Sequence, residues 1–394
     1  MSIQHSVWVL ARRAIGASAL LCTVAGAQSL GDVRPSPEPL VLKQQGSFFV
    51  GGRQMFSDAA GWDLIGLLGQ FSSGDVTVDQ MYVQFQIPQQ HRRHVPIVFV
   101  HGCCLSSKTW ETTPDGRMGW YEYFTRRGFP TYLGEQSGRA RSGFNGTIYN
   151  DVKKGLQPLT AQPPVLLGTA QFAWSVFRFG PSFGAVWPDE QFPMDHVGQL
   201  YKQVIPDMIL TEVPSLTAEF VNPLTNNPTV ANMAALARDL NGAILVGHSQ
   251  SSVFPTQAVL KGLPGVRGII QLETGCFANL TPDEVATMTK VPMLVVVGDH
   301  FAAPQPAPDC VTEMTEINAA GGDMSFIALP SAGLHGNSHM FMQDRNNLRV
   351  ADVIIKWIDE HVADAAEQNG ECRRTGAWVL SSGLCADKSE WFRP

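Results

Sequence analysis

The chain has 394 residues, of which 44% are hydrophobic and 16% charged, and its formal net charge at pH 7 is −7. The apolar fraction supplies a large buried core, which excludes a disordered chain, and the length permits one large domain or two ordinary ones. The sequence contains no long basic run, so it lacks the electrostatic footprint of a nucleic-acid-binding protein. Small or neutral partners fit this charge better than polyanions.

The N-terminal segment predicts a cleaved signal peptide over residues 1–27. Arg12 and Arg13 precede an apolar stretch at residues 14–24, and residues 25–27 place small side chains at the two positions that a signal peptidase reads. The apolar stretch is shorter than the roughly 20 residues that a bilayer crossing needs. We therefore expect a secreted or periplasmic protein without a membrane span in its mature form.

Six cysteines follow Cys22 of this segment, an even number in a chain directed to an oxidising compartment. Three disulfides are expected, although spacing alone cannot choose among the many pairings. A bond between adjacent cysteines would join Cα atoms about 3.8 Å apart, closer than the roughly 4.4 Å minimum that disulfides prefer, so free thiols or other partners are the alternative there. Proximity suggests Cys103–Cys104, Cys276–Cys310 and Cys372–Cys385, the last of which would staple a tail over residues 363–394.

The elements expected in chain order alternate between strands and helices. Residues 47–50 and 80–88 predict two strands that open a sheet, separated by a Gly-containing insert at residues 51–77. Later apolar runs suit strands that are buried on both faces of a parallel sheet, whose neighbours need helical crossovers. The expected strands are 96–100, 129–133, the run before Gly247, 268–272, 292–297 and 324–329, and the expected helices include 120–127 and 350–362.

This alternation predicts an α/β fold with a mostly parallel sheet flanked by helices. Between residues 149 and 226 it is interrupted by a segment rich in prolines and aromatic residues. We interpret that segment as a cap inserted between two core segments, residues 28–148 and 227–362. The alternative is that its aromatic side chains form the core of an inserted all-helical segment.

The segment around Ser249 is the most informative motif. An apolar run at residues 243–246 leads into Gly247-His248-Ser249-Gln250-Ser251, the pattern of a strand–turn–helix that presents a nucleophilic serine. Such a turn strains the serine backbone and needs small neighbours, and Ser251 stands where a second glycine is usual. An incidental serine at a glycine-rich strand end is the alternative. The motif predicts an α/β-hydrolase with Ser249 as nucleophile.

A serine nucleophile needs an imidazole base. Two histidines, His335 and His339, lie between the strand at 324–329 and the final helix. We favour His339, because the preceding Gly-Asn-Ser lets its loop reach across the sheet edge. His248 is expected to pack beside the turn.

The imidazole in turn needs a carboxylate, and two candidates follow neighbouring strands. Glu273 follows the strand at 268–272 and Asp299 the strand at 292–297. Both keep the chain order serine, acid, histidine, and both stand at the carboxyl ends of strands, where this fold builds its sites. These residues alone leave the choice open.

The developing oxyanion needs two backbone N–H donors. The residue after the nucleophile, Gln250, supplies one. Gly102 allows a sharp turn after the strand that ends at Val100, so Cys103 is the candidate for the second.

Several motifs together resemble the secreted bacterial esterases of the seven-one-three type over residues 45–362. The adjacent cysteines in the oxyanion turn are the most specific element. The resemblance implies an α/β-hydrolase fold, a vicinal Cys103–Cys104 disulfide lining the oxyanion hole, Glu273 as the acid, and a homodimeric carboxylesterase. The motifs are His101–Cys104, Thr109–Trp120, Gln136–Gly143, Gly247–Ser251 and Gly336–His339.

The sequence therefore predicts a serine carboxylesterase that acts on small-molecule esters through an acyl-Ser249 intermediate. His339 is the expected base, Glu273 the acid, and Cys103 and Gln250 the oxyanion donors, with no metal or organic cofactor. A hydrolase that cleaves a carbon–carbon bond next to a ketone with the same groups is one alternative. A non-catalytic binding module with this fold is another.

Overall fold

The computed structural model describes residues 30–62, 71–90, 95–208, 226–273, 275–277, 279–362, 378–379 and 385–386. The expected signal peptide over residues 1–27 lies outside them. Cys372 and most of the expected tail from residue 363 also lie outside them, so the predicted Cys372–Cys385 pair remains a prediction.

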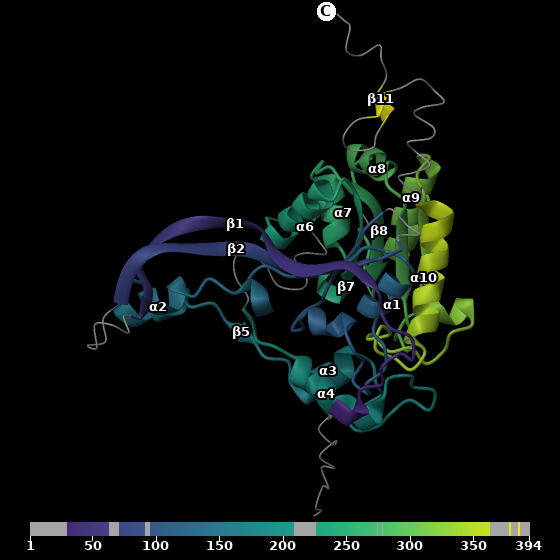
Figure 1. Cartoon of the computed structure of the whole chain (residues 1–394), viewed down its shortest axis with the longest axis horizontal. Helices are drawn as coiled ribbons and strands as arrows, with labels where there is room; N and C mark the ends of the chain where they lie inside the picture. Colours follow the sequence, from purple (N-terminus) through teal and green to yellow (C-terminus); the bar gives the residue numbers. More distant parts are fainter. Residues whose placement is uncertain are drawn as a thin grey trace, which may run out of the picture.

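A mixed sheet forms the centre of the described chain (Figure 1). Its strand order is β1-β2-β4-β3-β7-β8-β9-β10; β2 pairs antiparallel with β1 and β4, and all pairs from β4 to β10 are parallel. The carboxyl ends of β3, β7, β8 and β9 therefore meet at one edge. The strands are Leu42–Trp62 (β1), Phe71–Pro88 (β2), Ile97–Val100 (β3), Thr131–Glu135 (β4), Ala243–His248 (β7), Val266–Leu272 (β8), Met293–Val297 (β9) and Met324–Ala328 (β10).

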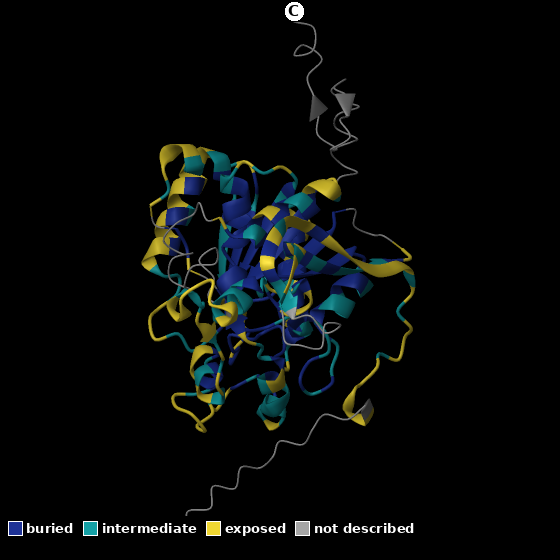
Figure 2. Cartoon of the chain, turned by 90° about the vertical axis from the view of Figure 1, so that its left-hand side faces the viewer, coloured by how far each residue is buried: buried dark blue, intermediate teal, exposed yellow. Residues whose placement is uncertain are grey.

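Helices cover both faces of the parallel strands, because successive strand side chains point to opposite sides. Ile97 and Phe99 pack in the cluster that contains α1 and α10, whereas Val98 and Val100 pack with α6, α7, α8 and α9. Buried residues accordingly fill the centre, and exposed ones lie on the outer helix surfaces (Figure 2). The helices are Trp120–Arg126 (α1), Pro228–Asp239 (α6), Phe254–Leu260 (α7), Pro282–Met288 (α8), Pro308–Ala319 (α9) and Asn347–His361 (α10).

The strands and helices expected for the two core segments are present; apart from β1 and β2, their ends differ from the expected ones by at most three residues. Strand β4 begins at Thr131 rather than at residue 129, because Pro130 has no N–H to donate to a ladder. The topology is that of the α/β-hydrolase fold, as predicted. No helix among the described residues is long and apolar enough to cross a membrane.

The insert predicted at residues 51–77 is wrong. Strands β1 and β2 run through most of it and pair into a long hairpin arm, residues 42–62 and 71–88, which projects from the body (Figure 1). Much of the arm faces solvent on both sides, so its sequence lacks the alternation of a half-buried strand, and Gly51 and Gly52 adopt left-handed φ values of 65° and 93°. Helix α2 (Thr147–Lys154) packs under the arm, where Lys154 Nζ donates to the Asp58 carbonyl at 2.8 Å.

The segment interpreted as a cap contains short elements joined by loops. Its rings at Trp174, Phe177, Phe179 and Phe192 are buried in the same cluster as α1 and α10, whereas Phe183 is 52% exposed. These four rings therefore pack as part of the core of the described chain. The cap boundaries stay a prediction, because residues 209–225 lie outside the described chain. The described elements are β5 (Val165–Leu166), α3 (Ala170–Val176), α4 (Val197–Gln203) and β6 (Asp207–Met208).

Candidate active site

Ser249 follows β7 directly and has a left-handed φ of 55°, a conformation that is costly for any residue except glycine. A Cβ on Gly247 would lie 2.0 Å from the Ser251 carbonyl oxygen, so only glycine fits before the turn. The Ser251 hydroxyl accepts from the His248 N–H at 3.0 Å and lies 2.9 Å from the Val100 carbonyl, to which it donates. This hydroxyl ties the turn to β3, which explains how a serine replaces the usual glycine.

The turn after β3 packs against this serine. A Cβ on Gly102 would lie 2.8 Å from both the His248 carbonyl oxygen and the Ser249 Cβ, so glycine permits the close approach. Cys103 and Cys104 are joined by a disulfide with Cα atoms 3.8 Å apart, as expected from the family resemblance, and Cys104 has a φ of 61°. A second disulfide joins Cys276 to Cys310.

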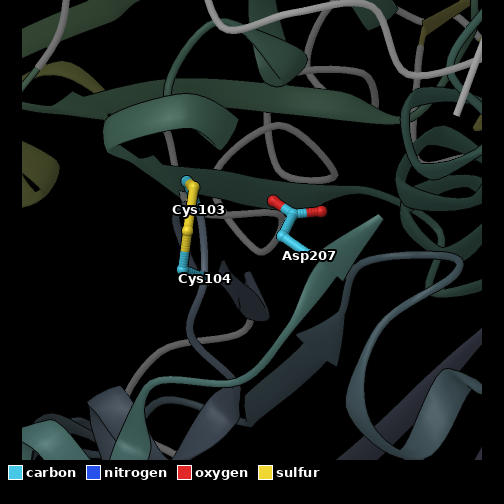
Figure 3. A group of neighbouring side chains, drawn as sticks. All are labelled: Cys103, Cys104 and Asp207. Carbon is cyan, nitrogen blue, oxygen red and sulfur yellow. A yellow bond between two sulfur atoms is a disulfide. The ribbon is translucent and has the colours of Figure 1, made fainter. Parts of the chain in front are cut away.

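Asp207 of β6 lies beside the vicinal disulfide (Figure 3). Its carboxylate accepts from Arg139 Nε at 2.5 Å, and both side chains are 4% exposed. Because both sulfurs are bonded to each other, neither is a thiolate ligand. We therefore read this cluster as a structural support of the turn rather than as a metal site.

Glu273 and His339 come together at the carboxyl edge. Glu273 follows β8 with a left-handed φ of 57°, and its Oε2 lies 3.0 Å from His339 Nδ1. Its Oε1 accepts from the Gly298 N–H at 2.6 Å, at the end of β9. His339 in turn donates its own N–H to the Phe177 carbonyl at 3.0 Å and stacks on the Phe177 ring.

The other acidic and histidine candidates lie elsewhere. The Asp299 carboxylate accepts from the Asn337 N–H at 3.1 Å, and so holds the loop that carries His339 instead of contacting the imidazole. His335 is exposed. His248 is buried beside the turn, as expected, and its Nε2 lies 2.9 Å from the His339 carbonyl oxygen.

Arg178, two residues after the end of α3, contacts the same two side chains, although the sequence does not predict it as a site residue. Its Nη2 donates to Glu273 Oε2 at 2.7 Å, and its Nη1 lies 3.3 Å from His339 Nδ1. Its Nε donates to the Asp299 carbonyl at 2.8 Å, and the guanidinium lies over the Phe301 ring. A sequence signal exists: it is the one charged residue between residues 170 and 188.

These contacts set the charges of the pair. Burial raises the pKa of Glu273, but Arg178, His339 and the Gly298 N–H outweigh it and hold this pKa at about 2. Burial lowers the pKa of His339, Glu273 opposes that shift, and Arg178 adds to it. Near neutral pH the site therefore holds a carboxylate beside a neutral imidazole.

The His339 Nε2 atom is buried and has no hydrogen-bond partner among the described residues. If Nδ1–H donates to Glu273, the lone pair lies on Nε2, where an imidazole can accept a proton. The carboxyl edge of the sheet thus holds a neutral imidazole oriented by a carboxylate, and Ser249 lies on a strained turn at the end of β7. Groups of these kinds are the ones that acyl transfer uses.

Similar proteins are known for most of the length of the chain. No protein-family model matches the chain. A novel bacterial esterase, solved at atomic resolution, shares 43% sequence identity, covers 84% of this chain and 99% of its own, and superposes with a TM-score of 0.75. A probable secreted lipase, PhiG, of a fungal species (strain ATCC 74256) is 24% identical over 334 residues, which are 71% of this chain and 86% of the lipase. The chain therefore belongs to the family of that bacterial esterase, the seven-one-three type of α/β-hydrolase that its motifs resemble.

Proposed function

We propose that this protein is a secreted serine carboxylesterase that hydrolyses small-molecule esters through an acyl-Ser249 intermediate. The observation that carries the proposal is the 3.0 Å contact between Glu273 Oε2 and His339 Nδ1. This pair lies at the edge of the sheet where Ser249, with its left-handed backbone, follows β7. Family membership supports the reaction class, because the matched structure is an esterase and the fungal relative is a probable lipase.

In the proposed cycle, Ser249 Oγ attacks the ester carbonyl while His339 Nε2 takes its proton. Glu273 accepts Nδ1–H and stabilises the imidazolium. His339 then gives the proton to the leaving alcohol as the ester C–O bond breaks, which leaves the acyl group on Ser249. A water molecule, deprotonated by His339, attacks the acyl-enzyme, and Ser249 regains its proton as the acid leaves.

The proposed oxyanion donors are the backbone N–H groups of Gln250 and Cys103. The close approach of Gly102 to Ser249 supports this assignment, because it brings the turn after β3 against the nucleophile. The Cys103–Cys104 disulfide closes that turn and limits its movement. Each such donor contributes about 10²- to 10³-fold to kcat in enzymes of this type. The cycle as written uses no metal or organic cofactor.

We also propose secretion after cleavage of residues 1–27 and assembly as a homodimer. The two disulfides in the described chain support an oxidising compartment, and the fungal relative is described as a probable secreted lipase. N-terminal sequencing of the exported protein tests the first proposal; a mature chain that still carries these residues overturns it. Sedimentation equilibrium of the mature protein tests the second, and a monomer at micromolar concentration overturns it.

The activity is tested by hydrolysis of a short-chain p-nitrophenyl ester by the mature, oxidised protein. We expect Ser249→Ala and His339→Ala to lower kcat by about 10⁵-fold or more. His335→Ala is the matched control, because it removes an exposed imidazole from the same loop, and it should hydrolyse the ester like the wild type. A fully active Ser249→Ala variant overturns the mechanism. A wild type that cleaves diketones but no ester points to the carbon–carbon bond alternative.

A further inference from the structure

Glu273 carries two cationic or hydrogen-bonding partners on a single oxygen atom. Oε2 lies 2.7 Å from Arg178 Nη2 and 3.0 Å from His339 Nδ1, while Oε1 is occupied by the Gly298 N–H. The acid side chain is 1% exposed and the arginine side chain 14%. A guanidinium in this position is a permanent cation next to the proposed base, because arginine keeps its charge at any pH of interest.

The contact between Arg178 and the imidazole is not a second hydrogen bond when the imidazole has the orientation proposed above. Arginine nitrogens only donate, and Nδ1–H already donates to Glu273, so the 3.3 Å approach of Nη1 brings a positive charge against the ring without a shared proton. That charge opposes formation of the imidazolium, whereas Glu273 favours it. The two residues therefore act on His339 with opposite sign.

Resting on the proposed function, we infer that Arg178 is a positioning residue: its guanidinium fixes the Glu273 carboxylate and keeps His339 the neutral base in mildly acidic solution. It acts through Glu273 and His339 and has no role of its own in bond making. Burial and the Arg178 charge lower the pKa of His339, whereas Glu273 raises it, and the net shift is downward. This direction agrees with the role inferred for Arg178.

Other charged groups near His339 do not replace this cation. His248 is buried 4.8 Å from it, ring to ring, and burial lowers its pKa to about 3, so it is neutral. Asp299 contacts Arg178 and Asn337 rather than the imidazole. Asp344 accepts from the Ser338 hydroxyl at 2.7 Å, and burial raises its pKa to about 6. Among the described residues, the charged or titratable groups around His339 are thus Arg178, His248 and Glu273 against the ring, and Asp299 and Asp344 against the loop that carries it.

The direction of the expected pH dependence follows from the protonation state that the proposed base needs. The reaction needs neutral His339, so kcat/KM falls as the pH drops through the pKa of this residue. Without the cation, the imidazolium forms more easily and this pKa rises. We expect Arg178→Met to move the acidic limb of the kcat/KM profile upward by about one pH unit. Arg178→Lys keeps the positive charge but loses the planar guanidinium that holds Glu273. The acidic limb of its kcat/KM profile should therefore stay near that of the wild type, while kcat falls.

Two readouts are used on the full mature protein. The first is the kcat/KM profile for a short-chain p-nitrophenyl ester, from mildly acidic to mildly alkaline pH. The second is the NMR titration of isotope-labelled histidine, with the His339 signal assigned from a His339→Gln variant. Arg126→Met is the matched control: Arg126 is 20% exposed and pairs with Glu122 at 2.7 Å on α1, so neither midpoint should move.

An unchanged midpoint in Arg178→Met in both readouts, whatever its activity or melting temperature, overturns the inference, because loss of packing alone does not shift a titration. If Arg178→Met does not fold, Arg178→Gln takes its place, because it also removes the charge but keeps a polar side chain: a midpoint raised by about one pH unit supports the charge argument, and an unchanged midpoint overturns it. If the wild type hydrolyses no ester, the proposed function fails, while the NMR titration still tests Arg178.

Discussion

The hairpin arm and the carboxyl edge of the sheet both contain residues with left-handed backbone conformations, but the surroundings of these residues differ. At the edge, Ser249 and Glu273 take left-handed conformations without being glycines, and each is enclosed by neighbours that hold it. In the arm, Gly51 and Gly52 take such conformations, and large rings such as Phe56 are exposed. The arm also contains one non-glycine residue with a left-handed φ, Asp79 at 66°. The comparison teaches that the two regions differ in burial: the residues at the proposed site are enclosed, whereas much of the arm is exposed.

The sharpest contrast concerns the acids. We expect Glu273→Gln to lower kcat/KM by about 10⁴-fold, because an amide cannot stabilise the imidazolium. Asp79→Asn in the arm, which breaks an exposed pair with Arg53, should change it by less than about threefold. Ester hydrolysis by purified variants measures both values. Asp299→Asn is the informative comparison at the edge, and a larger loss there than in Glu273→Gln would reassign the acid.

Matched glycines provide the next contrast. A methyl group on Gly102 meets the His248 carbonyl and Ser249 Cβ at 2.8 Å, so Gly102→Ala should push the turn after β3 away from Ser249, the proposed nucleophile, and lower kcat by about 100-fold. Gly74→Ala in the arm meets nothing within 4 Å and should leave kcat unchanged. Equal rates for the two variants would show that the turn after β3 has no part in the chemistry.

Removing one serine hydroxyl from each region should lower the free energy of unfolding by different amounts. Ser251→Ala removes the acceptor of the buried His248 N–H and the donor to Val100, so we expect a loss of about 1 to 2 kcal/mol in the free energy of unfolding. Ser72→Ala removes an exposed hydrogen bond to Gly61 in the arm and should cost less than about 0.5 kcal/mol. Denaturant titration measures both. A smaller loss for Ser251→Ala would contradict its role in tying the turn to β3.

The smallest effect on chemistry is expected in the arm. Phe56 is 63% exposed, so Phe56→Ser should leave kcat/KM within about twofold of the wild type. If the proposed dimer uses this arm, the same variant weakens association, which sedimentation equilibrium would detect. An arm variant that loses most of its activity while remaining folded would break the separation of the two regions.

The sequence predicted the fold wherever burial leaves a pattern. The runs in β3, β7, β8 and β9 are largely apolar because both of their faces are covered, and each strand lies within two residues of its expected bounds. The arm was not predicted, because a strand pair exposed on both faces needs no alternation of apolar and polar residues. In addition, Gly51 and Gly52 are residues typical of a loop.

The candidate site could be predicted only in part. The turn at Ser249 has a local signature, since its strain demands Gly247 beside it. The choice between Glu273 and Asp299 has none, because both follow adjacent parallel strands, and only the three-dimensional path of the His339 loop brings one carboxylate to the imidazole. Arg178 is marked in the sequence as the one charge between residues 170 and 188, but its partner Glu273 lies 95 residues away, and no local pattern identifies that partner.

The position of Arg178 constrains how substrate scope can be engineered. It lies between β4 and β7, in the segment interpreted as a cap, and the backbone of its neighbour Phe177 also holds His339. A chimera that exchanges this whole segment for one from another hydrolase would remove part of the support of its own base. Libraries are better aimed at exposed positions of the same segment, such as Phe183 and Val186, which leave that support intact.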